Sequence, residues 1–356
     1  METLLVKGTI RLADVAKAAG VSQGTASNVF SRPDVVREEV REHVLETARQ
    51  LGYAGPSLTG RLLRAGKVNA IGVAAAEPLA YFFDDPWARA LLAAIAQVCD
   101  ASGTGLALVS AKDRQKLDWT IKSALVDGFI LLCVEGGEKL VQLTRERQLP
   151  FIALALNDDD PSVPSVSVDN VGGAAAAARH LAELGHRRFA VLATEFSYDH
   201  VGPVGIDEIE RAVYSTSRDR ATGYWQALET FGIPREDVPV YETDNQKASV
   251  EDGLEYLFSA PEPPTAILAM SDYIALLTMS WLQARGLSVP GDVSIIGFDG
   301  VPEGGMVEPG LTTMAQPFAR IAERAVRAVL EDAMPVEREM IDVTLVVRGS
   351  TAAPKQ

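Results

Sequence analysis

Residues 12–30 read LADVAKAAGVSQGTASNVF, and this stretch decides the fold of the N-terminal part of the chain. Its first half carries one apolar stripe at helical spacing, made of Leu12, Val15, Ala16 and Ala19. Gly20 permits a sharp turn, and Ser22 is a good N-cap for a second helix over residues 23–30. Two short helices joined by a turn that contains glycine are typical of the helix-turn-helix.

The second of these helices carries polar side chains on its start and outward face, namely Ser22, Gln23, Thr25, Ser27 and Asn28. In the major groove of DNA, Gln and Asn can pair with adenine, and Ser and Thr can reach phosphates or base edges. A polar face that meets only water is the alternative. A third helix is expected over residues 37–51, with Val40, Val44, Ala48 and Leu51 on one face.

Charge is divided unevenly along the chain. The whole sequence has a net charge of −15, but residues 1–67 hold ten Lys and Arg against seven Asp and Glu, a net +3. The remainder therefore carries −18. A mildly basic head on an acidic body fits DNA contact through the head alone, because phosphates repel the body.

The run from Ile10 to Val73 resembles the head of the lactose-repressor (LacI/GalR) family of bacterial regulators. The matching segments are Asp14-Val15-Ala16, Ala19-Gly20-Val21-Ser22, Thr25-Ala26-Ser27 and Leu51-Gly52-Tyr53. The resemblance implies DNA contacts at Ser22, Gln23, Gly24, Thr25, Ser27, Asn28, Ser31 and Arg32. Many members carry Arg where Asn28 stands, and Gly24 offers no side chain, so the base preference of a relative does not transfer.

The segment 55–68 corresponds in this family to a hinge helix that folds in the DNA minor groove. There a leucine is inserted as a wedge that kinks the operator. The resemblance places this leucine at Leu63, and it implies further DNA contacts at Ser57, Arg61 and Arg64. A plain linker with an incidental leucine is the alternative.

From Asn69 onward, apolar strands alternate with amphipathic helices. Strands are expected at 70–75, 105–109, 128–134, 151–156, 165–168, 189–193, 266–270 and 293–298. Helices are expected at 87–101, 171–184, 218–231, 272–286 and 317–332. This alternation is typical of a doubly wound α/β fold with parallel sheets, in which ligands bind beyond the carboxyl ends of the strands.

Enzyme signatures are missing from the sequence. No dinucleotide fingerprint follows the first strand, no phosphate loop or nucleophile elbow occurs, and the histidines lack metal-ligand spacing. We therefore expect no catalytic residue, metal or cofactor, and a structural role for His186. Cys99 and Cys133 fit buried thiols in a reducing compartment. Without a signal peptide or an apolar membrane span, we expect a cytoplasmic protein with no membrane contact.

The body resembles the same family along nearly its whole length, through Val168-Asp169-Asn170, Leu184-Gly185-His186-Arg187-Arg188, Val289-Pro290-Gly291-Asp292, Gly297-Phe298-Asp299 and Leu311-Thr312-Thr313. This implies an all-α helix-turn-helix head plus hinge helix, followed by an α/β type-I periplasmic-binding-protein-like core of two doubly wound subdomains. The expected divisions are a head at 1–54, a hinge at 55–68, a core at 69–350 and a tail at 351–356. Within the core, the N-subdomain takes 69–165 and 317–340, and the C-subdomain 166–316 and 341–350.

The resemblance also implies effector contacts in the core. Arg220, Ser271 and Asp299 fall on family effector positions, and the following Asp272 is expected to cap a helix. Five further candidates follow the first strands: Glu77, Tyr81, Phe83, Glu135 and Asn157. Each of these five suits the wall or surface as well as a ligand contact. Residues 195–219 form either a lid over the cleft or a solvated excursion.

Together these features predict a sequence-specific repressor that binds a pseudo-palindromic operator as a homodimer and responds to a carbohydrate-like effector. A periplasmic solute receptor would instead carry a signal sequence and lack the helix-turn-helix. A metabolic enzyme with an appended head would need a phosphate loop or a catalytic group. A protein coregulator in place of the small molecule stays open.

Overall fold

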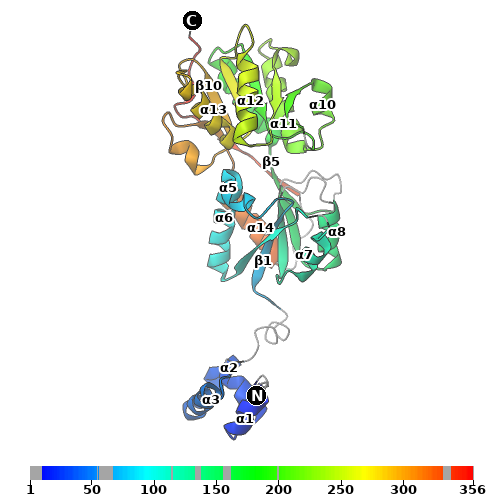
Figure 1. The fold of residues 1–356 in the computed structure, drawn as a ribbon, viewed down its shortest axis with the longest axis vertical. Coiled ribbons are helices and arrows are strands. Elements are labelled where there is room, and N and C mark those ends of the chain that lie inside the picture. Colours follow the sequence, from blue (N-terminus) through cyan, green and yellow to red (C-terminus); the bar gives the residue numbers. More distant parts are fainter. Residues whose placement is uncertain are drawn as a thin grey trace, which may run out of the picture. The chain divides into compact units, whose positions relative to one another are not determined.

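The computed structural model describes residues 10–53, 55, 67–113, 115–132, 138–154, 162–198, 200–331 and 338–355. The chain forms two compact units, Met1–Val68 and Asn69–Gln356 (Figure 1). The first is the small helical head, and the second is the α/β core. Among the described residues, no helix is long and apolar enough to cross a membrane.

The head is the expected helix-turn-helix. Its helices are α1 (Leu12–Ala18), α2 (Gln23–Ser31) and α3 (Glu38–Leu51), with a 3₁₀ turn, η1, at Pro33–Val35. Gly20 has a φ of +64°, and the Ser22 hydroxyl accepts a hydrogen bond from the Thr25 N–H at 3.0 Å, so the predicted turn and N-cap are confirmed. The small core consists of Val15, Ala16, Ala19, Ala26, Val29, Val44 and Ala48. Leu51 was expected on this inner face but is 36% exposed, because the helix ends there.

The core begins with a six-stranded parallel sheet, here called sheet A, of order β12-β5-β4-β3-β1-β2. Its strands are β1 (Ala70–Ala75), β2 (Gly105–Ser110), β3 (Gly128–Leu132), β4 (Phe151–Leu154), β5 (Ser165–Val168) and β12 (Arg338–Ile341). Helices α6 (Pro86–Ser102) and α14 (Phe318–Leu330) cover one face. Helices α7 (Leu117–Ser123) and α8 (Glu138–Glu146) cover the other, and the short α5 (Tyr81–Asp84) precedes α6. Sheet A and these helices form the N-subdomain.

The C-subdomain is built on a seven-stranded sheet, sheet B, of order β13-β11-β10-β9-β6-β8-β7. Its strands are β6 (Phe189–Ala193), β7 (Gly202–Val204), β8 (Val240–Glu242), β9 (Ala266–Ala269), β10 (Ser294–Asp299), β11 (Thr312–Ala315) and β13 (Thr344–Val346). The two edge strands, β7 and β13, run antiparallel to their neighbours. Helices α9 (Asn170–Glu183) and α11 (Ser215–Glu229) cover one face, and α12 (Lys247–Phe258) and α13 (Asp272–Ala284) cover the other. Three shorter helices complete it: α10 (Ile206–Glu210), η2 (Arg235–Asp237) and η3 (Pro302–Gly305).

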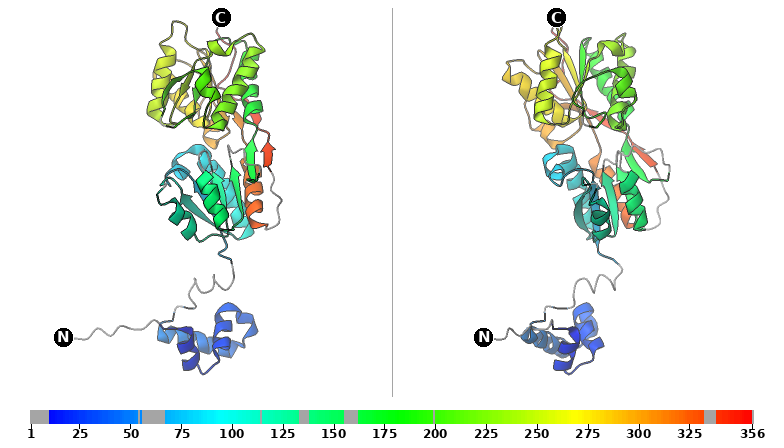
Figure 2. Two further views of the ribbon diagram at one scale, coloured as in Figure 1. Left: turned by 90° about the vertical axis from the view of Figure 1, so that its right-hand side faces the viewer. Right: turned by 45° about the vertical axis from the view of Figure 1, so that its right-hand side comes forward.

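The chain passes between the two subdomains three times (Figure 2). The first crossover was expected near residue 165, but β5 pairs with β4 and β12 in sheet A, so the chain leaves this sheet only after Val168. The other two crossovers follow β11 and β12, near the expected positions 316 and 341. The expected tail also packs on the core, since the carbonyl of Ala352 lies 2.9 Å from Nε2 of the buried His186. His186 therefore has the structural role expected of it.

Residues 195–219 are neither a lid nor a solvated excursion. They supply β7, which extends sheet B beside β8, and the short α10. Phe196, Ile209 and Ala212 are buried in the core cluster under α9 and α11. The buried carboxylate of Glu242 accepts hydrogen bonds from the Phe196 and Ser197 N–H groups at 2.6 and 3.0 Å, which ties this segment to the end of β8.

Candidate DNA-contact helix and effector site

Helix α2 presents an exposed polar face. Gln23, Gly24 and Asn28 are exposed, as are Ser31 and Arg32 at the end of the helix, while Thr25 and Ser27 are half-buried. Three of the candidate hydroxyls are used inside the head: that of Ser22 caps α2 and is hydrogen-bonded to that of Thr25, and that of Ser31 donates to the Ser27 carbonyl at 2.9 Å. The amides of Gln23 and Asn28 are thus the exposed groups best suited to base edges.

Six residues expected to bind DNA or effector lie outside the described part of the chain: Ser57, Arg61, Leu63, Arg64, Glu135 and Asn157. The remaining effector candidates are all described. They fall into one group at the carboxyl ends of the strands of sheet B and a second group after β1 of sheet A.

Arg220 lies at the centre of the first group. It was expected to start a helix, but α11 begins at Ser215, which places Arg220 in the second turn. The side chain is buried, and its guanidinium stacks over the Phe298 ring at 3.8 Å from the centroid. Nε donates to Oδ1 of Asn170 at 2.9 Å, and Nη1 donates to the carbonyl of Met270. Arg220 therefore links the starts of α9 and α13 across the sheet edge.

Asp299 ends β10 beside this arginine. Its Oδ1 lies 3.8 Å from Nη2 of Arg220 and accepts a hydrogen bond from Nε2 of Gln316 at 2.8 Å. Asp299 is 4% exposed and has a φ of 134°, a backbone conformation that side chains rarely adopt. Burial raises the pKa of Asp299 well above its ordinary value, and Arg220 opposes this while the nearby carboxyls of Asp272 and Asp85 add to it.

The structure gives the cap of α13 to Ser271 and not to Asp272. Ser271 is the N-cap of α13, since its hydroxyl oxygen accepts from the Ile274 N–H at 3.1 Å. Asp272 is fully buried, and its carboxylate accepts hydrogen bonds from the backbone N–H groups of Gly300 and Val301. It thereby fixes the loop that follows Asp299. The prediction that Asp272 caps the helix is wrong, because the residue before it reaches the cap position first.

The N-subdomain approaches this cluster through the start of α6. Asp85, the N-cap of α6, accepts a hydrogen bond from Asn245, and Trp87 donates one to Gln316. From the sequence, none of these four is predicted as an effector contact, because isolated acids, amides and aromatic residues of this kind occur throughout the chain. The segment sits immediately after α5, which carries two of the expected contacts.

The candidates after β1 are dispersed. Phe83 is 61% exposed, whereas its neighbour Phe82 is fully buried in the core of the N-subdomain. Tyr81 is half-buried and packs edge-on against Phe82 at 6.0 Å between ring centroids. Glu77 is exposed in the loop, and partial burial raises the pKa of its carboxyl. These residues do not join the buried cluster around Arg220.

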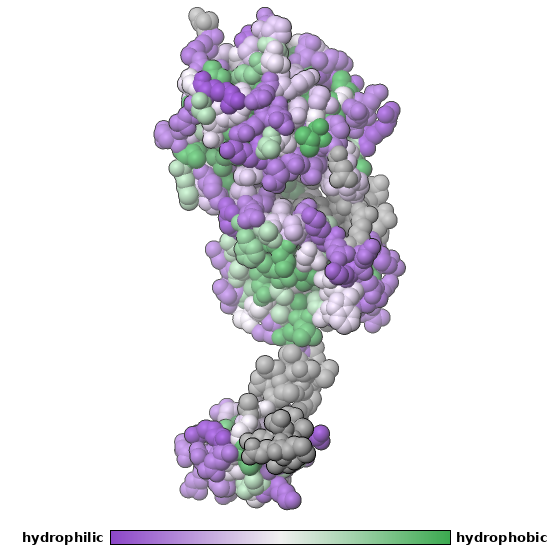
Figure 3. Space-filling view, viewed as in Figure 1, coloured by the Kyte–Doolittle hydropathy of each residue, from purple (hydrophilic) through white to green (hydrophobic). Residues whose placement is uncertain are grey.

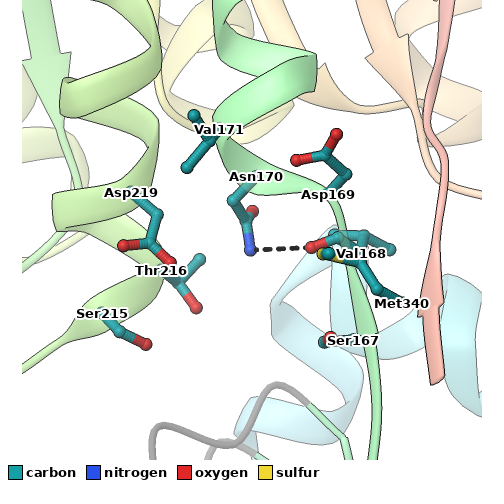
Figure 4. Close-up of a pocket in the computed structure, with 9 residues that line it drawn as sticks. All are labelled: Ser167, Val168, Asp169, Asn170, Val171, Ser215, Thr216, Asp219 and Met340. Atoms are coloured by element: carbon teal, nitrogen blue, oxygen red, sulfur yellow. Dashed lines mark hydrogen bonds between the residues drawn. The ribbon is translucent and has the colours of Figure 1, made fainter. Parts of the chain in front are cut away.

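A pocket of about 120 Å³ lies at the first crossover, next to Arg220 (Figure 4). It is formed by the end of β5, the start of α9, the first turns of α11 and one residue of β12: Ser167, Val168, Asp169, Asn170, Val171, Ser215, Thr216, Asp219 and Met340. Asn170 connects the pocket to the cluster, because its Nδ2 donates to the Val168 carbonyl at 3.3 Å while its Oδ1 accepts from Arg220. The lining between the two subdomains thus contains hydroxyls, an amide and the carboxylate of Asp219, while the carboxylate of Asp169 caps α9.

Comparison with known proteins agrees with both parts of this architecture. Residues 11–55 match the model of the bacterial regulatory proteins of the lacI family, and residues 178–351 match a periplasmic binding protein-like domain. An HTH-type transcriptional regulator of Mycobacterium tuberculosis is 36% identical over 351 residues, which are 96% of this chain and 97% of the relative. The chain belongs to the lacI family of bacterial regulatory proteins.

Two further relatives extend this result. The HTH-type transcriptional repressor CytR of Escherichia coli is 30% identical to this lacI-family chain over 355 residues, 96% of each protein. The solved structure of a complex of the transcriptional regulator CelR with cellobiose has a TM-score of 0.67 and 25% identity, and covers 96% of this chain and 99% of that one. The chain is therefore a transcriptional regulator with a DNA-binding head and a ligand-binding core, and not an enzyme.

Proposed function

We propose that this regulator binds a pseudo-palindromic operator as a homodimer, and that an uncharged carbohydrate bound between the subdomains of its core controls operator affinity. The observation that carries the proposal is the polar cluster of Arg220, Asp299, Asn170 and Ser271 at the strand ends of sheet B, which Gln316 joins to the N-subdomain. All of these side chains except Asn170 are buried. Alternating donors and acceptors of this kind suit the hydroxyl groups of a sugar.

The charges around the cluster favour a neutral ligand over an anionic one. Nε and Nη1 of Arg220 already have acceptors, and Nη2 faces the carboxylate of Asp299. Two more carboxyls, those of Asp272 and Asp85, lie close enough to raise the pKa of Asp299. A phosphate or carboxylate group would meet these acids with the single arginine already engaged. The complex of the related CelR with cellobiose supports a neutral sugar as the first class to test.

A thermal-shift screen tests this proposal, because a ligand that binds only the folded state raises the melting temperature. The panel consists of neutral mono- and disaccharides, each paired with its phosphorylated form. We expect one neutral sugar to stabilise the protein and its phosphorylated partner to fail. Arg220→Ala should abolish the shift, whereas Arg179→Ala, on the exposed face of α9, should leave it unchanged. Stabilisation by phosphorylated sugars alone would refute the neutral class.

For the head, we propose that Gln23 and Asn28 read base edges. Asn28→Ala should relax base preference at one operator position by about 1–3 kcal/mol. Gln50→Ala, an exposed amide on α3, is the matched control and should leave the preference unchanged. Selection of bound sites from a randomised operator library measures the base preference of both variants. An identical preference in Asn28→Ala and wild type would refute the proposal that Asn28 reads a base edge.

The hinge proposal follows from the family resemblance of residues 55–68. Leu63 is proposed as the minor-groove wedge, with Ser57, Arg61 and Arg64 as flanking contacts. Leu63→Ala should then lose operator bending and much specific affinity while keeping dimerisation. A circular-permutation bending assay decides this, since equal bend angles and equal affinity would mean that 55–68 is only a tether.

The homodimer is proposed to form through the N-subdomain. Helix α6 contains no charged residue from Ala90 to Cys99, although Ala93 and Gln97 on it are exposed. Figure 3 shows apolar residues gathered on the N-subdomain in the view in which α6 appears in Figure 1. An uncharged outer face suits a second copy of the chain. Ala93→Glu should give a monomer in analytical ultracentrifugation. If this variant remained a dimer, the interface would not include this face of α6.

A further inference from the structure

The N-subdomain meets the C-subdomain through polar side chains on one short segment, the cap and first turn of α6. Asp85 accepts a hydrogen bond from Nδ2 of Asn245, which follows β8, at 3.1 Å. Trp87 donates from its indole Nε1 to Oε1 of Gln316, which follows β11, at 3.1 Å. Each C-subdomain partner is an amide, and an amide carries a donor at one end and an acceptor at the other.

The second end of each amide bonds to a residue of the effector site. Oδ1 of Asn245 accepts a hydrogen bond from the Ser271 hydroxyl at 3.2 Å. Nε2 of Gln316 donates to Oδ1 of Asp299 at 2.8 Å. Two separate side chains therefore connect the α6 segment to the effector site by single amide groups. Because each amide is hydrogen-bonded at both ends, the loss of the bond at one end lets the side chain reorient and weakens the hydrogen bond at the other end.

A third contact between the subdomains lies outside this relay. Arg89 forms an ion pair with Glu303 of η3, and these side chains are 44% and 35% exposed. Solvent screens such a pair, which limits its contribution. Gln316 is buried, and Asp85 and Asn245 are half-buried, so their hydrogen bonds are better shielded from water. We therefore expect the two amides to contribute more than the Arg89–Glu303 pair to the stability of the contact between the subdomains.

We propose that Asn245 and Gln316 are the coupling residues of the core, which transmit the occupancy of Ser271 and Asp299 to the contact between the subdomains. A ligand hydroxyl that takes over the bond of Ser271 or Asp299 releases one end of an amide and with it the contact to Asp85 or Trp87. This inference rests on the proposed binding role of Ser271 and Asp299. Asn245 and Gln316 are then the side chains through which ligand binding changes the contact between the subdomains.

The Asp85–Asn245 pair allows a reciprocal exchange. Asn245→Asp places a second carboxylate against Asp85 and should break the contact. The double variant Asp85→Asn/Asn245→Asp reverses donor and acceptor and should restore it. Asn caps helices as well as Asp does, so the bond from the Ala88 N–H at 2.8 Å, which starts α6, is preserved. Gln283→Glu, on the exposed face of α13, adds the same single charge and serves as control.

Spin labels at Lys116→Cys and Glu255→Cys report the separation of the subdomains in the full chain with no ligand added. Both positions are exposed, and Cys99 and Cys133 are replaced by Ala in this background. In Asn245→Asp, the population at the wild-type distance should fall about tenfold relative to open forms, in line with a lost hydrogen bond to a charged group. The double variant and Gln283→Glu should retain it. A wild-type distance in Asn245→Asp, or no recovery in the double variant, would overturn the proposal.

The link to the effector site has its own measurement. Ser271→Ala removes the hydroxyl that bonds Asn245 and should move the label distance in the same direction as Asn245→Asp. Ser271→Thr keeps a hydroxyl and should leave it in place. An unchanged distance in Ser271→Ala would refute the coupling. Because no carbohydrate is used, failure of the sugar screen and failure of this relay are distinguishable.

Discussion

Replacement of Asp272 tests how the effector site is held in shape. Its Oδ2 accepts hydrogen bonds from the backbone N–H groups of Gly300 and Val301 at 2.7 and 2.8 Å, and its Oδ1 accepts one from the Thr313 hydroxyl at 2.6 Å. The Thr313 hydroxyl can rotate about its C–O bond, whereas the two backbone donors are fixed in direction. At about 1–3 kcal/mol for each donor left without a partner, Asp272→Ala should lower the free energy of unfolding by about 4 kcal/mol.

Asp272→Asn is the matched control. Its amide oxygen can accept from both backbone N–H groups while its nitrogen donates to Thr313, so we expect a loss of less than about 1 kcal/mol. Burial raises the pKa of Asp272 above the ordinary 3.8, so between the two values the folded chain binds more protons than the unfolded one. The free energy of unfolding of the wild type thus falls as pH rises through this window. Because Asn does not titrate, the stability of Asp272→Asn relative to wild type should increase over the same window.

Urea unfolding of the three proteins between pH 4 and pH 8, followed by tryptophan fluorescence, measures these differences. Equal losses in Asp272→Ala and Asp272→Asn would refute the reasoning, because they would show that charge rather than hydrogen bonding holds the loop. A difference between Asp272→Asn and wild type that did not change with pH would refute the stated direction of the pKa shift.

Two further predictions concern packing and capping. Gly223→Ala should lower the free energy of unfolding of the core by about 1–3 kcal/mol or more, because its new Cβ would lie 2.2 Å from the Val171 carbonyl oxygen where α11 crosses α9. Urea unfolding measures this loss. Gly305→Ala is the control and should be tolerated, because its new Cβ meets no atom closer than 3.9 Å. Ser22→Ala should lower the free energy of unfolding of the head by about 1 kcal/mol and speed amide hydrogen exchange in α2. Ser31→Ala, at the other end of α2, should not change exchange at the N-terminus of the helix. Equal exchange rates in Ser22→Ala and wild type would contradict the capping role.

Local rules were sufficient for the head. The N-cap at Ser22, the turn at Gly20 and the burial of Ala26 and Val29 all depend on residues within one or two helical turns, so the sequence specifies them directly. The same holds for the central strands, since continuous apolar runs such as Phe189–Ala193 and Gly128–Leu132 are buried along their whole length. The short strands β7 and β8, at and next to the edge of sheet B, show no such pattern, and their place in the sheet depends on pairing with distant residues.

The sequence by itself determined the helix-turn-helix and the alternation of strands and helices, and its motifs, through their resemblance to the lacI family, implied the two-subdomain core and the expected contacts Arg220 and Asp299. It did so because periodicity, turn residues and motif order are properties of neighbouring residues. Only the tertiary structure decided which side chains bond to these two. Asn245, Gln316 and Asp85 are separated along the chain by up to 231 positions, and their hydrogen bonds exist because the three crossovers bring strand ends and α6 together. The loss of the expected cap role of Asp272 has the same cause, since its buried carboxylate accepts hydrogen bonds from backbone donors that only the fold brings to it.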